Sequence, residues 1–349
     1  MNPLVFAAGD RSTPQITMAQ NRQILKIFGG EVGLTSWHGE FGKIATWLSD
    51  DFGSCPHDGP LKSRKMTIEI VKDLPPQKGL LWFWRPGTWV YGWGSKKNYR
   101  TSRGIRMQIQ FTPDRQVQIA GPNLEIIYET LYLLILSTIG EWFETDGWIR
   151  LHALSLESES GPLIFIAPQG FGKSLLAGLL VDRKSMVRPL GDEIALVKGR
   201  EFLAFPLRLA LAPQIALDFQ IPTSGRRTYR QGQAHKSILS GKPSSQTSQR
   251  SPEVFFIRQI RESWHELPGL SLRSQFEILI GRGLPQMIEY LFRLDHLRDL
   301  TQTLINRMRW IQHSRRAETL TDLQAGPRTP EAIESFSKTF MLTGELNRP

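Results

Sequence analysis

The chain has 349 residues, of which 40% are hydrophobic and 22% charged, with a formal net charge of +10. This composition is ordinary for a globular protein with a hydrophobic core, and the ten tryptophans and eighteen phenylalanines argue against a disordered chain. The positive charge either suits an anionic partner, such as a nucleotide, a nucleic acid or an acidic peptide, or is simply a solvated basic surface.

Residues 1–122 are predicted to form an N-terminal, mainly β region whose role the sequence does not define. Periodicity is weak over residues 1–65. From Lys65 onward, short apolar or alternating runs separated by turns are typical of a small antiparallel β unit. The predicted strands lie at 66–71, 80–84, 88–93, 105–111 and 116–119. Five aromatic residues here form either one face of a packed sheet or a stacking platform for bases: Trp82, Trp84, Trp89, Tyr91 and Trp93.

Asn123 is expected to cap a helix that runs to about Phe143. Its centre, Leu131–Ile139, is the most apolar stretch of the chain, yet it is far shorter than the ~20 residues that span a membrane. We therefore expect a buried core helix. The single cysteine, Cys55, excludes an intrachain disulfide, and no signal-peptide pattern opens the sequence. Together these features predict a cytoplasmic protein.

Residues 123–349 are predicted to form a larger region of α/β character. The expected elements are strands at 149–156, 163–167, 194–197 and 254–257, and helices at 173–183, 286–310 and from Pro330 onward. Residues 223–252 carry basic residues but no acidic one, among Ser, Gly, Gln and Thr, which indicates a flexible basic loop.

The segment Ala167–Ser174 fits the P-loop pattern Ala/Gly-x-x-x-x-Gly-Lys-Ser/Thr. Its glycines let the backbone turn so that N–H groups surround phosphate oxygens, and the N-terminus of the following helix favours the same anion. Lys173 is expected to reach the β- and γ-phosphates, and Ser174 to bind Mg²⁺. The alternative is a glycine-rich turn with an incidental Lys-Ser. The predicted nucleotide-binding residues are Ala167, Pro168, Gln169, Gly170, Phe171, Gly172, Lys173 and Ser174.

Two carboxylates, Asp192 and Glu193, directly precede the apolar run 194–197. They could hold a metal ion or accept the proton of an attacking hydroxyl, and the alternative is a solvated turn. In ordinary P-loop motor and transport ATPases the apolar strand precedes the acidic pair, so the reversed order here argues against that class. His152 lies on a predicted strand, where a lone histidine is more often structural than catalytic.

The tripeptides Leu151-His152-Ala153 and Gly191-Asp192-Glu193, the P-loop, and Ala204-Phe205-Pro206-Leu207 resemble the catalytic domain of bacterial HPr kinase/phosphorylase. They resemble even more the shorter HPr-kinase-like proteins of bacterial gene clusters for modified peptides. The resemblance covers residues 148–215. It implies a P-loop core like that of HPr kinase and PEP carboxykinase, ATP and Mg²⁺ as cofactors, a protein or peptide hydroxyl as acceptor, and a homo-oligomer.

By this resemblance, the catalytic residues are Lys173 on the phosphates, Asp192 as the base toward the acceptor, and His152 near the γ-phosphate. Ser174 and Glu193 would hold the metal ion. The chain departs from the family pattern where Glu193 replaces a second aspartate and where Ala167 replaces a leading glycine. Residues 1–120 do not resemble the family's N-terminal domain, and its second signature is not found downstream.

We therefore predict an α/β protein of α+β character, with an HPr-kinase-like core of mixed sheet at residues 123–349. Its expected activity is ATP- and Mg²⁺-dependent phosphoryl transfer to a serine or threonine. A nucleotide-binding scaffold or sensor without transfer is the alternative, which the Asp-Glu pair favours. A nucleic-acid-binding protein has less support, because no motif of that class is found. The stretch 223–252 either meets the acceptor or is a flexible insertion.

Overall fold

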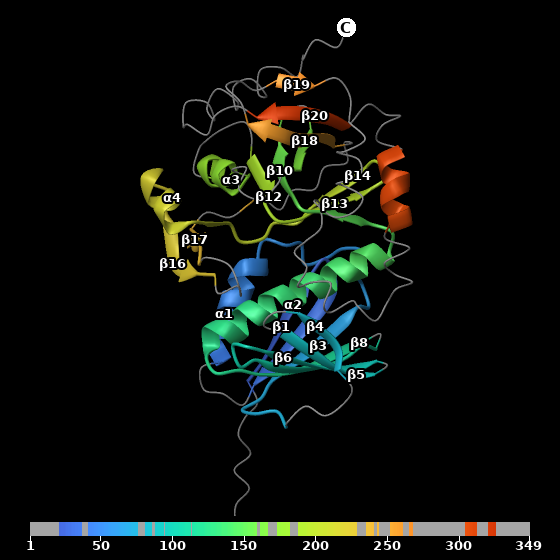
Figure 1. Cartoon of the computed structure of the whole chain (residues 1–349), viewed down its shortest axis with the longest axis vertical. Coiled ribbons are helices and arrows are strands. Elements are labelled where there is room, and N and C mark those ends of the chain that lie inside the picture. The colour runs from blue at the N-terminus through green and yellow to red at the C-terminus, as the bar shows by residue number, and fades with distance from the viewer. Residues whose placement is uncertain are drawn as a thin grey trace, which may run out of the picture.

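Two layered parts make up the protein, a large sheet with two helices and, next to it, a group of smaller sheets with the remaining helices (Figure 1). The computed structural model describes residues 21–36, 41–75, 81–85, 88–93, 95–112, 114–158, 161–166, 173–181, 188–228, 235–240, 243, 252–260, 265–267, 304–312 and 320–325.

The first part is an eight-stranded sheet in the order β1-β2-β3-β8-β7-β6-β5-β4. The predicted antiparallel unit is confirmed from β4 to β8, where each strand pairs antiparallel with the next. It is wrong for β3, which pairs parallel with both β2 and β8, so the sheet as a whole is mixed. The helix α1 (Phe41–Phe52) connects β2 to β3 and allows the parallel pairing. The strands are β1 (Asn21–Ile27), β2 (Gly30–Ser36), β3 (Lys65–Ile70), β4 (Leu81–Arg85), β5 (Thr88–Trp93), β6 (Lys96–Thr101), β7 (Arg106–Gln110) and β8 (Asp114–Ala120).

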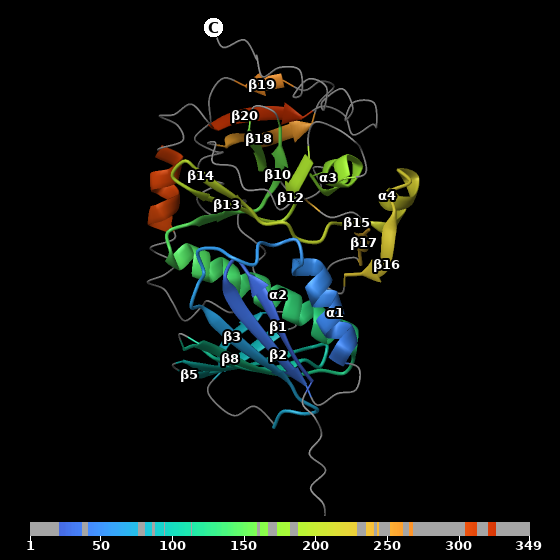
Figure 2. The same cartoon turned by 180° about the vertical axis from the view of Figure 1, so that it is seen from behind.

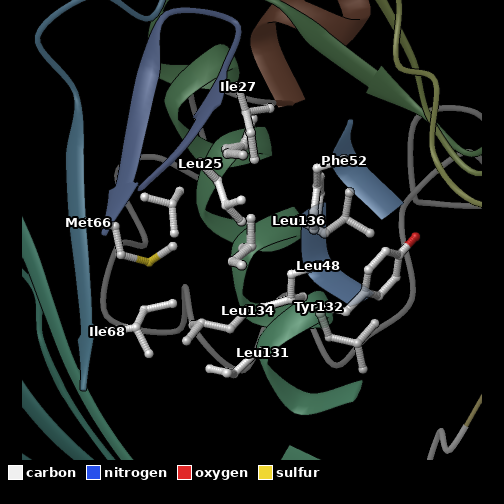
Figure 3. Packing of buried hydrophobic residues seen from close by; sticks show 14 of the residues in the cluster. Leu25, Ile27, Leu48, Phe52, Met66, Ile68, Leu131, Tyr132, Leu134 and Leu136 are labelled. Atoms are coloured by element: carbon white, nitrogen blue, oxygen red, sulfur yellow. The ribbon is translucent and has the colours of Figure 1, made fainter. Parts of the chain in front are cut away.

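The helix α2 (Leu124–Thr145) packs on this sheet together with α1, and it lies between the sheet and the second part (Figure 2). The predicted cap is confirmed, because the Asn123 side chain accepts a hydrogen bond from the Ile126 N–H at 3.0 Å. By length and composition α2 could cross a membrane, but 89% of its apolar window is buried inside the protein. Its leucines face the apolar side chains of the sheet (Figure 3), so α2 is the expected core helix.

The second part contains a six-stranded sheet, β12-β10-β11-β18-β20-β19, and a three-stranded sheet, β14-β13-β9. The single strand predicted at 149–156 is two strands, β9 and β10, and the chain passes from the three-stranded sheet to the six-stranded sheet at His152. The described strands of this part are β9 (Ile149–Leu151), β10 (Ala153–Glu157), β11 (Pro162–Ile166), β12 (Arg188–Gly191), β13 (Ala195–Lys198), β14 (Glu201–Ala204), β18 (Glu253–Ile260), β19 (His265–Leu267) and β20 (Leu320–Ala325).

A third small sheet, β15-β17-β16, packs with α4 (Pro213–Asp218) against α3 (Lys173–Val181). A Cβ at Gly178 of α3 would lie 3.1–3.2 Å from Leu211, Ile221 and Leu239, which shows how closely helix and sheet approach. The strands are β15 (Ala210–Leu211), β16 (Thr223–Arg227) and β17 (Ser237–Leu239).

The prediction of a flexible loop over 223–252 is therefore wrong at 223–227 and 237–239, because these residues form β16 and β17, and β17 pairs with both β15 and β16. Residues 229–234, 241–242 and 244–251 lie outside the described residues. Of the predicted C-terminal helices, residues 304–312 are helical, and the helix at Pro330 lies outside the described residues.

The mixed α/β content and the large mixed sheet confirm the predicted fold class at the level of α+β character. One hydrophobic cluster joins α2 to the eight-stranded sheet, with members between positions 25 and 148 of the sequence. The same cluster includes Ile194, Leu196 and Phe205 of the second part. The two parts thus share a core across α2, and a division at residue 122 stays a prediction.

Candidate functional site

The site forms where three strands of the six-stranded sheet meet at one edge. β10 runs antiparallel to both β11 and β12, with Ala153 opposite Ile166 and Ser155 opposite Gly191. The carboxyl ends of β11 and β12 therefore lie beside the beginning of β10. This edge brings together the segments that carry His152, the P-loop and the Asp-Glu pair.

α3 begins at Lys173, seven residues after β11 ends at Ile166, so the predicted P-loop segment connects a strand to a helix. Only Lys173 and Ser174 of the predicted loop can be placed. The remaining predicted nucleotide-binding residues lie outside the described residues: Ala167, Pro168, Gln169, Gly170, Phe171 and Gly172.

Lys173, Ser174 and Asp192 come together in a largely buried group. Lys173 is 8% exposed and Asp192 6% exposed. Burial raises the pKa of Asp192 to about 6 and the nearby Glu193 carboxylate adds to the rise, whereas a hydrogen bond with Ser174 and the charges of Lys173 and Lys236 oppose it. Burial also lowers the pKa of Lys173, an effect that Asp192 opposes and Lys236 reinforces.

One oxygen of this group, Asp192 Oδ1, is buried and has no hydrogen-bond partner within the described part of the chain. A buried carboxylate oxygen left unpaired costs free energy, so it marks a place where a cation or a ligand hydroxyl would bind favourably. Among the described residues, no cluster of three or more His, Cys, Asp or Glu could hold a metal ion by itself. Mg²⁺ is usually held by one or two carboxylates with phosphates and water, so the hydroxyl of Ser174 and the adjacent carboxylates fit it.

Glu193 is held from two sides. Its Oε2 accepts a hydrogen bond from the Tyr132 hydroxyl at 3.3 Å, and its backbone oxygen lies 3.1 Å from Nδ1 of His152. Because a carbonyl oxygen only accepts, Nδ1 carries the proton and, in the neutral ring, Nε2 is the basic nitrogen. His152 therefore anchors the main chain of the Asp-Glu pair.

Sequence reasoning found Lys173, Ser174, Asp192, Glu193 and His152, and the structure places all five around one edge of the sheet. It missed Tyr132 of α2, which belongs to no motif and lies far from the site in sequence, so the chain alone carries no signal for it. Lys236, which immediately precedes β17, lies in the basic stretch 223–252 that the sequence indicated, but it was not singled out there.

No protein-family model and no curated protein matches the chain. What the site does therefore has to be inferred from its own residues.

Proposed function

We propose that the protein is an ATP- and Mg²⁺-dependent phosphotransferase of the HPr kinase type, acting in the cytoplasm on a serine or threonine of a protein or peptide. The observation that carries the proposal is the buried group of Lys173, Ser174 and Asp192 at the start of α3. A lysine and a carboxylate are costly to bury. Lys173 opens the helix that follows β11, where a P-loop lysine meets its phosphates, and Asp192 directly follows the nearby strand β12.

Nucleotide binding would use the predicted loop Ala167–Gly172 together with the two residues that open α3. The backbone N–H groups at the N-terminus of α3 and the Lys173 ammonium supply positive charge for the phosphates. Lys236 adds a further positive charge from the small sheet, since its field reaches both Lys173 and Asp192. The site is thus suited to a polyphosphate rather than to a neutral ligand.

The metal ion would be held by the Ser174 hydroxyl and the Glu193 carboxylate, beside Asp192. When bound, Mg²⁺ would neutralise charge on the β- and γ-phosphates. The hydroxyl, the carboxylates and the buried Oδ1 of Asp192 all support a cation at this place.

Asp192 suits the base of the transfer step. With a pKa of about 6 it is mostly ionised at pH 7, and it can accept the proton of the acceptor hydroxyl. The hydroxyl oxygen then forms the new bond to the γ-phosphorus, the bond to the β–γ bridging oxygen breaks, and ADP leaves. His152 positions Asp192 indirectly, by holding the main chain of the next residue.

The test is phosphoryl transfer from ATP and Mg²⁺ to candidate acceptor peptides, followed by mass spectrometry. Lys173→Ala should lower the transfer rate by about 100-fold or more, because it removes charge from the developing negative phosphoryl group. Lys198→Ala is the matched control, since Lys198 is exposed and donates to the backbone oxygen of Asp146 in a turn. Unchanged transfer by Lys173→Ala would overturn the proposal. ATP binding without transfer to any acceptor would favour the non-catalytic scaffold or sensor.

A further inference from the structure

Tyr132 connects the N-terminal core to the candidate site. Its ring is fully buried in the core that α2 shares with the large sheet, 5.5 Å from the ring centroid of Phe52. In Figure 3 it lies at the edge of the apolar cluster, and its hydroxyl points away from the labelled leucines. That hydroxyl donates to Glu193 Oε2 at 3.3 Å. The N-terminal part therefore contributes a polar contact to the Asp-Glu pair.

Arg208 holds the ring of Tyr132 in place. Its guanidinium lies 3.7 Å from the centroid of the Tyr132 ring, a cation–π distance. The same guanidinium donates to both oxygens of Glu129 at 2.7 Å and to Asp51 at 3.2 Å. Since Glu129 and Asp51 belong to α2 and α1, an arginine of the second part is fixed by the helices of the first. Neither Arg208 nor Tyr132 can move without breaking these contacts.

We propose that Tyr132 is a positioning residue for the Mg²⁺–ATP site, which orients the Glu193 carboxylate for the metal ion through its hydroxyl. The inference rests on the proposed function and assigns a role in it to the N-terminal part of the chain. A hydrogen bond to one oxygen of a ligating carboxylate fixes the orientation of the whole group, and such supporting partners affect metal affinity strongly. The hydrogen bond from Tyr132 also restricts the side chain of Glu193, which has one more rotatable bond than the aspartate of the family pattern and therefore more freedom to lose.

The same contacts connect metal binding to the docking of the two parts. If Glu193 binds the ion best when Tyr132 and Arg208 are in place, then the ion in turn stabilises that arrangement by the same free energy. Mg²⁺–ATP should therefore raise the unfolding temperature more than ATP alone. This extra rise should depend on the Tyr132 hydroxyl.

The experiment compares Tyr132→Phe with Tyr128→Phe, a tyrosine one turn earlier on α2. The Tyr128 hydroxyl bonds Asp51, Arg208 and Arg226, so its loss perturbs the same helix and the same arginine. Calorimetric titration of Mg²⁺ at saturating ATP gives the Mg²⁺ midpoint. We expect Tyr132→Phe to raise it about tenfold with metal-free ATP binding unchanged, and Tyr128→Phe to change it less than about twofold.

A double variant tests whether Tyr132 acts through Glu193. In a Glu193→Gln background, Tyr132→Phe should have no further effect on the Mg²⁺ midpoint, whereas independent roles would give additive effects. An unchanged midpoint in Tyr132→Phe, or equal shifts in both tyrosine variants, would overturn the inference and leave the proposed function standing. Absence of ATP binding by the wild type would overturn both.

Discussion

Two groups of buried charge, one at the contact of the two parts and one at the candidate site, differ in how completely the chain pairs them. At the contact of the two parts, Arg208 bonds Glu129 and Asp51, and Arg226 bonds Asp51 again at 3.1 Å. At the candidate site, Asp192 keeps one buried oxygen without a partner in the described part of the chain. Charges paired within the protein hold its parts together, whereas a charge left incompletely paired costs stability and is suited to a ligand.

The largest expected effect follows from breaking the paired group. Arg208→Met should lower the free energy of unfolding by about 3–5 kcal/mol, because it leaves two buried carboxylates without their main cation. Arg64→Met is the control, since Arg64 pairs with Asp146 at 3.2 Å in a part-exposed bridge and should cost less than about 1 kcal/mol. Urea unfolding measures both. Equal losses would show that burial does not distinguish the two ion pairs.

A second buried ion pair, Arg150 with Glu144, shows how tightly such charges are packed, and a substitution at the neighbouring Gly140 tests this packing. Arg150 and Glu144 pair at 3.0 Å and are almost completely buried. A Cβ at Gly140 would lie 2.2–2.6 Å from the Arg150 side chain. Gly140→Ala should therefore lower the free energy of unfolding by about 1–3 kcal/mol although alanine favours helices.

Gly42 of α1 is the matched control for this change, because a Cβ there would meet no atom of the described residues within 4 Å. Gly42→Ala should stabilise the protein by up to about 1 kcal/mol. Thermal unfolding of the two variants gives the comparison, and a stabilised Gly140→Ala would mean that Arg150 has room to move.

Changing Asp192, in the incompletely paired group at the candidate site, should stabilise the ligand-free protein instead of destabilising it. The folded-state pKa of Asp192, about 6, lies above the ordinary value of 3.8, so the folded state binds this proton more tightly. The group's contribution to stability is therefore full below about pH 4 and is lost as the pH rises through 6. Asp192→Asn should stabilise the ligand-free protein at pH 8 by on the order of 1–3 kcal/mol and abolish transfer.

The measurement is urea unfolding of wild type and Asp192→Asn between pH 4 and pH 8. The difference in free energy should shrink toward zero near pH 4, where the wild-type carboxyl is also neutral. A destabilised Asp192→Asn at pH 8 would place Asp192 with the paired, structural charges instead.

Sequence patterns predicted the elements that local chemistry specifies. Asn123 caps α2, and the run Leu131–Ile139 is apolar enough to require burial. In β1, exposed Ile24 stands beside buried Leu25 and weakens the alternation that would have indicated a strand. In β6, the inward-facing Lys97 has the same effect. The exposed strand β16 forms through its pairing with β17 rather than through a pattern in its own sequence.

In the candidate site, too, some residues could be predicted from local sequence patterns and others could not. Lys173, Ser174 and Asp192 could be predicted together because the P-loop motif and the acidic pair each have a known chemistry. Tyr132 could not, because it lies 61 residues before Glu193 and inside an apolar run that indicates only a core helix. Its contact depends on how α2 packs against the second part, which no local pattern describes.

Calorimetric titration of ATP into the protein, with and without Mg²⁺, measures directly whether the buried group binds a nucleotide. We expect the wild type to bind ATP, Mg²⁺ to tighten binding, and Lys173→Ala to lose it while Lys198→Ala does not. No heat of ATP binding in the wild type, or equal binding by the Lys173→Ala variant, would contradict the claim that the buried Lys173, Ser174 and Asp192 form a nucleotide site.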